Sequence, residues 1–305
     1  MFQIRTDLAL EAKEIYSDGK TDIDGIRSDY KSYDGIDINR VQITNETGAK
    51  KLGKPKGTYV TLEMPKIIER NPDFAKVVTC RFSEEIGKII EPYAKQGCVL
   101  VAGLGNWNIT PDALGPKVIS GLLVTRHLKT YMPERFDESV NGVCAISPGV
   151  LGITGIETNE IIRGIVNHVK PSAVIAIDAL ASRRVERVNT TIQISDTGIS
   201  PGSGVGNRRG ELSKQTIGVP VIAVGVPTVV DAATIAVDAI ENLTPKGEDK
   251  QRLVRELLSP YYQNLIVAPK NMDAMITDMS NIISAGLNMA LQSGLSYEDA
   301  VNFRN

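Results

Sequence analysis

The sequence predicts an α/β protein with three layers, in which a mostly parallel or mixed sheet carries helices on both faces. Apolar runs without polar alternation are typical of parallel strands that are buried on both sides, and they lie at residues 98–102, 143–146, 173–177 and 219–224. Helical periodicity marks segments at residues 71–95, 111–129 and 158–169. Strands that alternate with helices build sheets that helices cover on both faces.

Length, charge and composition narrow the functional classes. The chain has 305 residues, which suffice for one large domain with a sizeable core, and its net charge is −2. A basic face for direct nucleic-acid binding is therefore not expected, and no apolar run approaches the ~20 residues that cross a bilayer. The 3 cysteines show no disulfide spacing and fit a reducing, cytoplasmic compartment.

The N-terminal part of the chain carries weaker signals. Residues 1–40 are polar and rich in turn signals, which predicts an irregular arm followed by short pieces. Residues 41–43 and 58–62 alternate in the manner of strands, and the basic loop 48–57 between them is predicted to be a solvated hairpin connection.

The C-terminal half continues the alternation. Residues 190–195 predict a strand, placed at a sheet edge, and the glycine-rich loop 196–210 follows it. A helix is expected over 229–241, a polar break over 244–252, and mostly helix from 253 to 305. We expect a single domain over residues 1–305, with residues 244–305 as a helical segment packed on it.

Two carboxylates follow buried strands of the predicted sheet. Gly103 and Gly105 turn the chain after the strand 98–102, and Asp112 then lies in the first turn of the next helix. Asp178 directly follows the strand 173–177. Open α/β sheets bind ligands at the carboxyl ends of their strands, so both side chains can reach one pocket. Stabilisation of a helix N-terminus alone is the competing interpretation for Asp112.

Such a pair suits acid–base chemistry. Two carboxyl groups a few ångströms apart cannot both ionise easily, so one keeps a proton near neutral pH. The ionised group can take a proton from water, and the protonated group can polarise a scissile carbonyl.

Other chemistries fit less well. The dinucleotide pattern that begins at Gly103 has Asn108 in place of its third glycine. Residues 198–202 match the letters of a nucleophile elbow but lack its strand–turn–helix context. His127 and His168 are expected to be structural, and no zinc motif is present.

Several long motifs identify a resemblance that runs from the N-terminus to the C-terminus. They are GLGNWNITPDALGP, SPGVLGITGIET, AVIAIDALASRR, ISDTGISPGSGVGNRRG and VPTVVDA. These motifs are similar to those of the germination protease (spore protease) family of endospore-forming bacteria, an atypical class of aspartic endopeptidase. The resemblance implies a fold like that of hydrogenase maturation proteases, and it implies Asp112 and Asp178 as the catalytic pair.

The resemblance also implies a biological role. Members of this family degrade small acid-soluble spore proteins during germination, in the cytoplasm of the spore core. They need no cofactor and no metal, and they assemble as homotetramers. We therefore expect small acid-soluble spore proteins as substrates, a homotetramer, and neither nucleic acid nor membrane as a partner.

Family members are made as zymogens that cleave themselves near the N-terminus. The matching motif here predicts a cut between Asp7 and Leu8, with residues 1–7 as the propeptide. An acidic residue before the cut calls for a cationic pocket, for which the candidate residues are Arg183, Arg184, Arg208 and Arg209.

Two alternatives remain open at this point. One is a nickel-dependent protease of the maturation type, which would lose activity on exhaustive chelation. The other is a non-catalytic module that only binds spore proteins, which would bind them stoichiometrically without releasing peptides.

Overall fold

The computed structural model describes residues 6–17, 23–135, 140–202, 210–236 and 265–302. Its strands form one mixed sheet in the order β1-β2-β3-β7-β8-β6-β4-β5, with β9 added beside β8. The strands are β1 (Ile26–Tyr33), β2 (Ile36–Ile43), β3 (Gly57–Glu63), β4 (Val99–Gly103), β5 (Val143–Ile146), β6 (Ala173–Ser182), β7 (Thr191–Ser195), β8 (Val221–Asp231) and β9 (Ile266–Val267). The pairs between β8, β6, β4 and β5 are parallel, and those from β1 to β8 through β7 are antiparallel.

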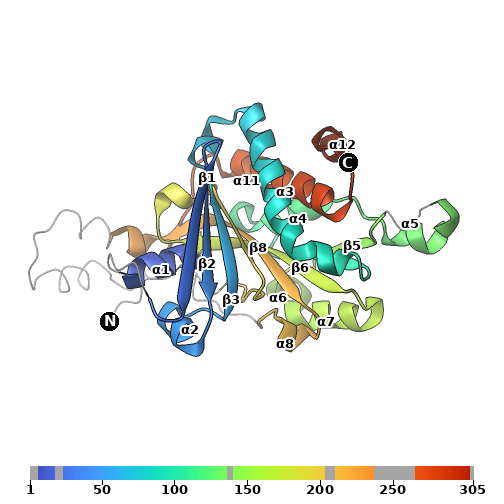
Figure 1. The fold of residues 1–305 in the computed structure, drawn as a ribbon, viewed down its shortest axis with the longest axis horizontal. Coiled ribbons are helices and arrows are strands. Elements are labelled where there is room, and N and C mark those ends of the chain that lie inside the picture. Colours follow the sequence, from blue (N-terminus) through green and yellow to red (C-terminus); the bar gives the residue numbers. More distant parts are fainter. Residues whose placement is uncertain (1–5, 18–22, 136–139, 203–209, 237–264, 303–305) are drawn as a thin grey trace, which may run out of the picture.

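Helices cover both faces of the sheet, which confirms the predicted three-layer α/β class (Figure 1). One face carries α3 (Pro72–Ala94), α4 (Leu114–Ser120) and α11 (Met272–Leu291), whose apolar side chains join the largest core cluster. The other face carries α7 (Thr158–Val169) and α8 (Lys214–Ile217), and α1 (Ala9–Ser17) and α2 (Glu46–Leu52) lie against β2 and β3. The remaining short elements are α5 (Arg126–Tyr131), α6 (Leu151–Thr154), α12 (Tyr297–Asn302), η1 (Pro65–Glu69), η2 (Thr110–Asp112), η3 (Pro133–Arg135) and η4 (Val185–Arg187).

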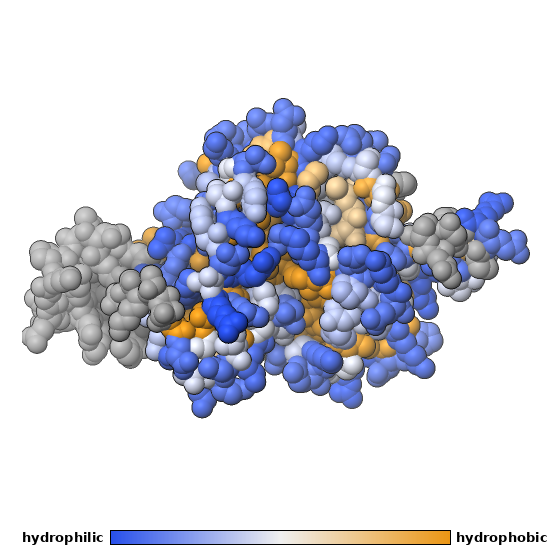
Figure 2. Space-filling model, in the orientation of Figure 1, coloured by the Kyte–Doolittle hydropathy of each residue, from blue (hydrophilic) through white to orange (hydrophobic). Residues whose placement is uncertain are grey.

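Burial explains the strongest predictions. Every residue of β4 is buried, and so is β6 apart from Ala179, because helices cover both sides of these central strands. Helix α3 begins where Asn71 accepts hydrogen bonds from the amides of Asp73 and Phe74. On the face shown in Figure 2, hydrophilic residues predominate and hydrophobic residues appear mainly in narrow strips between them. Among the described residues, no helix combines the length and apolar character that a bilayer span requires.

The expected helix over 111–129 was wrong, because the chain is broken there into η2, α4 and α5. Asn288 of α11 accepts a hydrogen bond from the Leu123 amide at 2.9 Å and donates one to the Gly121 carbonyl at 3.0 Å. The Thr125 amide then bonds the Val143 carbonyl, which holds this segment beside β5. A partner far away in the sequence therefore ends α4.

The N-terminal arm is more regular than expected. Helix α1 and strand β1 both lie within residues 1–40, and α2 occupies part of the basic loop 48–57. Strand β1 was not predicted because its side chains are mostly polar. They are polar because β1 is an exposed edge strand, which pairs with β2 on one side. Helix α2 begins at Asn45, whose side chain accepts a hydrogen bond from the Gly48 amide.

Three strand predictions also need correction. Strand β7 lies inside the sheet between β3 and β8, not at an edge. Strand β8 runs to Asp231, so the helix expected from Val229 begins only at Ala232. Strand β6 runs to Ser182, so Asp178 lies within it. The expected break at 244–252 lies outside the described residues; from 265 onward, β9, α11 and α12 are described.

Candidate active site

The loop after β4 positions Asp112 by packing its own backbone tightly against the backbone of Asp112. Gly105 has φ +110, and a Cβ atom there would lie 2.1 Å from the Asp112 carbonyl oxygen. The Asn106 amide donates a hydrogen bond to that same carbonyl at 3.0 Å. The glycines of this loop therefore let it fold back against η2, which places the Asp112 side chain beyond the end of β4.

Asp178 lies in the part of β6 that extends beyond the end of its neighbour β4. The last residue of β4, Gly103, is paired with Ile177, whereas Asp178 is paired with Gly225 of β8 on the other side. Asp178 is only 4% exposed, and one of its carboxylate oxygens accepts a hydrogen bond from the Ala179 amide at 3.0 Å. The departure of β4 opens the space into which both carboxyl groups point.

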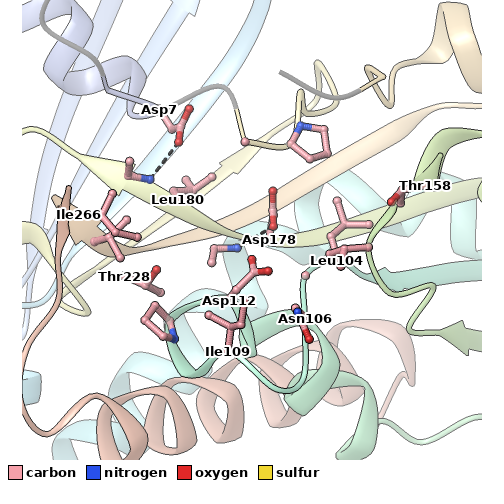
Figure 3. A pocket seen from close by; sticks show the side chains of 18 of the residues that line it. Asp7, Leu104, Asn106, Ile109, Asp112, Thr158, Asp178, Leu180, Thr228 and Ile266 are labelled. Atoms are coloured by element: carbon pink, nitrogen blue, oxygen red, sulfur yellow. Dashed lines mark hydrogen bonds between the residues drawn. The ribbon is translucent and has the colours of Figure 1, made fainter. Parts of the chain in front are cut away.

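A cavity of about 420 Å³ brings the two carboxyl groups together (Figure 3). Asp112 and Asp178 line it with Asn106, Thr158, Thr228 and Asp7, and the rest of its wall is mostly apolar. Burial raises the pKa of Asp112 to about 6, against a lowering effect of the Asn106 amide. Burial, followed by the charges of Asp112 and Asp7, raises the pKa of Asp178 well above its usual range. These shifts favour a pair that holds one proton near neutral pH.

The segment around Asp7 reaches the same cavity. The Asp7 amide donates to the Ala181 carbonyl at 3.0 Å, and the Ala181 amide donates to Oδ2 of Asp7 at 2.9 Å. Leu8, the next residue, is fully buried. The chain's own N-terminal segment thus lies along β6, within the charge field of Asp178.

Gln193 of β7 holds both sides of the Asp7–Leu8 peptide bond. Its amide nitrogen Nε2 donates to the Asp7 carbonyl oxygen at 3.3 Å, and its Oε1 accepts from the Ala9 amide at 2.7 Å. The sequence pattern marked Gln193 only as a polar position of an alternating strand, so this role is visible only in the fold.

A buried ionic cluster anchors α1, the helix after this segment. Glu11 is 1% exposed and accepts hydrogen bonds from the amides of Arg183 and Arg184. The buried Arg187 side chain contacts Glu14 at 2.6 Å, Glu63 at 2.8 Å and Glu11 at 3.3 Å. Burial alone would lower the pKa of Arg187, but the hydrogen bonds with Glu14 and Glu63 raise it. Sequence reasoning did not find this cluster.

The other candidate residues lie in different settings. The guanidinium of Arg184 lies 3.5 Å from Glu14, and Arg183 is part of the same turn after β6, so their role as an acid pocket stays a prediction. Arg208 and Arg209 lie outside the described residues. His127 and His168 are exposed and line neither of the two large cavities. Among the described residues, no three His, Cys, Asp or Glu side chains are grouped so that they could hold a metal ion.

A mixed α/β sheet that presents two carboxyl groups with raised pKa values to one cavity defines an enzyme-like site for acid–base chemistry. The family model described as germination protease matches residues 5–246 and 243–304 of this chain. The chain therefore belongs to the germination protease family, and it is a protease of spore germination.

Individual relatives agree over their full length. The chain is 51% identical to the germination protease of Caldanaerobacter subterraneus, over 97% of this chain and 96% of that protein. It is 48% identical to that of Clostridium acetobutylicum over all of both chains, and 43% identical to that of Bacillus subtilis over 100% and 97%.

Among solved structures, the crystal structure of a [NiFe] hydrogenase maturation protease, HycI from Thermococcus kodakarensis, covers 62% of this chain and 91% of its own. The sequence identity is 16% and the TM-score is 0.31, so this likeness carries no argument about the fold or the site.

Proposed function

We propose that this protease is an endopeptidase that uses Asp112 and Asp178 to degrade small acid-soluble spore proteins in the spore core during germination. The observation that carries the proposal is the cavity that both carboxyl groups share with the chain's own Asp7. The proposal includes synthesis as a zymogen that cuts its own Asp7–Leu8 bond, and assembly as a homotetramer.

The proposed reaction is hydrolysis by general acid–base catalysis. The ionised carboxylate takes a proton from a water molecule, whose oxygen forms a bond to the scissile carbonyl carbon. The protonated carboxyl group gives its proton to the carbonyl oxygen, which produces a neutral tetrahedral intermediate. The carboxyl group that took a proton from water then gives it to the amide nitrogen as the C–N bond breaks. The other carboxylate takes back a proton from a hydroxyl group of the intermediate, so that a carboxylic acid and an amine are released and the pair is restored.

Both carboxyl groups have raised pKa values. Burial raises the pKa of Asp112 to about 6, and burial together with the charges of Asp112 and Asp7 raises the pKa of Asp178. The two groups titrate as a coupled pair, so base and acid are roles within the singly protonated pair.

Self-processing is supported by how the N-terminal segment is held. Gln193 donates to the Asp7 carbonyl, which is the carbonyl of the bond to be cut, and it also holds the Ala9 amide. The same side chain would bind the corresponding backbone groups of a substrate. While the segment remains in place, Asp7 forms part of the wall of the dyad's cavity, which supports an inactive zymogen.

The cut itself can be tested directly. We expect the purified full chain to shorten on incubation to a product whose first residue is Leu8, as determined by N-terminal sequencing and intact mass. We also expect added small acid-soluble spore protein to be converted to a few fragments, which mass mapping will place after acidic residues. A new terminus other than Leu8 would contradict the processing site, and stoichiometric binding without fragments would contradict the endopeptidase.

The pH dependence follows from the raised carboxyl pKa values. We expect the self-cleavage rate to rise as the pair loses its first proton and to fall as it loses its second, because the pKa values of both groups are raised. Initial rates between about pH 4 and pH 9 will show this bell shape. A rate at pH 5 equal to that at pH 7 would contradict a catalytic pair with raised pKa values.

Folding stability should fall as the pH increases, whereas the self-cleavage rate first rises. Because both carboxyl pKa values are raised by folding, the folded protein holds more protons than the unfolded chain above the ordinary Asp pKa of about 3.9. This contribution to stability is complete at low pH and is lost as the pH rises through the folded pKa values. Asp178→Asn should therefore lose less thermal stability between pH 5 and pH 8 than the wild type.

A further inference from the structure

Asp7 lies at the boundary between two cavities. The first, of about 420 Å³, contains Asp112 and Asp178, and the second, of about 370 Å³, lies over β7 and β8. Lys54, Tyr59 and Gln193 line the second cavity, and Asp7 lines both. The residue before the proposed cut therefore faces a second built space, which the mechanism does not use.

The contacts of Asp7 are of two kinds. Its backbone contacts could be made by most residues, whereas its side-chain contact depends on the acid. Its backbone amide and carbonyl bond to Ala181 and Gln193, and every amino acid except proline could make both contacts. Only its side chain distinguishes it, through Oδ2, which accepts from the Ala181 amide at 2.9 Å. By itself, the Ala181 amide would bond to Asn as well as to Asp, because this N–H group needs a hydrogen-bond acceptor and not a negative charge.

Lys54 supplies the charge. It directly follows Gly53, the residue in left-handed conformation that ends α2, and its amide bonds back to the Ala49 carbonyl. The Lys54 Nζ donates to the Thr6 carbonyl at 3.4 Å, one residue before Asp7. Burial lowers the pKa of Lys54, while the charges of Asp7 and Glu11 oppose that shift. A partly buried ammonium group thus lies within the field of the Asp7 carboxylate.

We propose that Lys54, together with the Ala181 amide, forms the subsite that selects an acidic side chain immediately before the scissile bond. The proposal rests on the proposed endopeptidase function and names the residue that recognises the acidic side chain already expected before the cut. Lys54 provides the discrimination between a carboxylate and its neutral amide, which the backbone donor cannot provide. In a partly buried site such a charge pair is screened less than one on the surface.

This assignment differs from the arginine pocket expected from the sequence. The Arg184 guanidinium lies against Glu14, and the amides of Arg183 and Arg184 hold Glu11. Through these contacts the turn after β6 binds two acids of α1 and so anchors that helix. Lys54 instead belongs to the connection between α2 and β3.

The test uses self-cleavage of the full chain, with the rate of appearance of the Leu8 terminus as the readout. We expect Lys54→Met to slow self-cleavage by roughly tenfold or more, since it removes a partly buried positive charge near the Asp7 carboxylate. Lys54→Arg, which keeps the charge, should stay within roughly threefold of the wild type. The matched control is Lys56→Met, because Lys56 pairs with the exposed Glu46 and lines neither cavity.

A double-mutant cycle separates Asp7 from Glu11 as the partner of Lys54. Asp7→Asn should slow the reaction strongly in the wild type but change it by less than roughly threefold in Lys54→Met. The charge-reversed pair, Lys54→Glu with Asp7→Lys, should be faster than either single variant. Equal effects of Asp7→Asn in both backgrounds, or a wild-type rate for Lys54→Met, would overturn the subsite.

A second readout does not depend on cleavage. In Asp112→Asn, which keeps the segment intact, hydrogen exchange at the Asp7 and Ala181 amides reports how firmly the segment is held. We expect adding Lys54→Met to accelerate exchange at both amides, and adding Lys56→Met to leave it unchanged. If the wild type never cleaves itself, the proposed function fails, and unchanged exchange in the Lys54→Met protein would separately overturn the subsite.

Discussion

Asp112→Asn and Asp178→Asn are each expected to lower the rate of self-cleavage and of spore-protein digestion by about 10²–10⁴-fold. Each substitution keeps the shape of the side chain but removes one proton carrier from the shared cavity. Asn at either position can neither take up a proton from water nor give one to the carbonyl oxygen. Initial rates measured by intact mass at pH 7 will show the loss.

The matched control for the dyad is Asp231→Asn. Asp231 is also a buried acid at the end of a central strand, β8, but it lines neither cavity and its carboxylate caps the amide of Thr234. Asn keeps that acceptor, so we expect activity close to that of the wild type. Both dyad variants should fold, because each removes a carboxylate that burial disfavours. Full activity in either dyad variant would rule out the two-aspartate mechanism.

The second large effect concerns folding stability. Arg187→Met should lower the free energy of unfolding by about 3–5 kcal/mol, because Glu11 would keep its buried charge without this cationic partner. The guanidinium contacts three carboxylates from two parts of the fold, α1 and β3, so Met can fill the space but cannot neutralise them. Urea denaturation followed by circular dichroism will measure the loss.

Arg70→Met is the control for this comparison. Arg70 also pairs with a carboxylate, Asp278, at 2.7 Å, but both side chains are at least one-third exposed. Solvent screens such a pair, and its removal should cost no more than about 1 kcal/mol. Because Arg187 anchors α1 and thereby the Asp7–Leu8 bond, self-cleavage should also slow in Arg187→Met. A stability loss no larger than that of Arg70→Met would show that the cluster does not anchor α1.

The predictions of strands and helices were correct where a single physical cause determined the residue pattern. The strands β4 and β6 were found because burial on both faces requires continuous apolar residues. Helix α7 was predicted with its exact limits, since its apolar residues repeat at the helical period and Lys170 ends it in left-handed conformation. In these segments the local pattern and the tertiary environment agree.

The errors occurred where distant partners override the local pattern. The segment 111–129 has a helical pattern, but Asn288 of α11 satisfies the backbone groups at its break. Strand β7 alternates as an edge strand would, yet β3 pairs with its free side. No pattern within either segment contains that information, because both outcomes depend on which elements are docked beside it.

The same division applies to the site. The sequence alone determined the α/β class and the two acids that follow glycine-rich or apolar strand segments, since backbone geometry and burial leave a direct mark on residue type. Only the tertiary structure decided that Gln193 bonds to the Asp7 carbonyl, Lys54 to the Thr6 carbonyl, and Arg187 to acids of the following helix α1. The physical reason is that hydrogen bonds and charge pairs depend on distance in space, and the fold brings these residues together from strands and turns far apart in the chain.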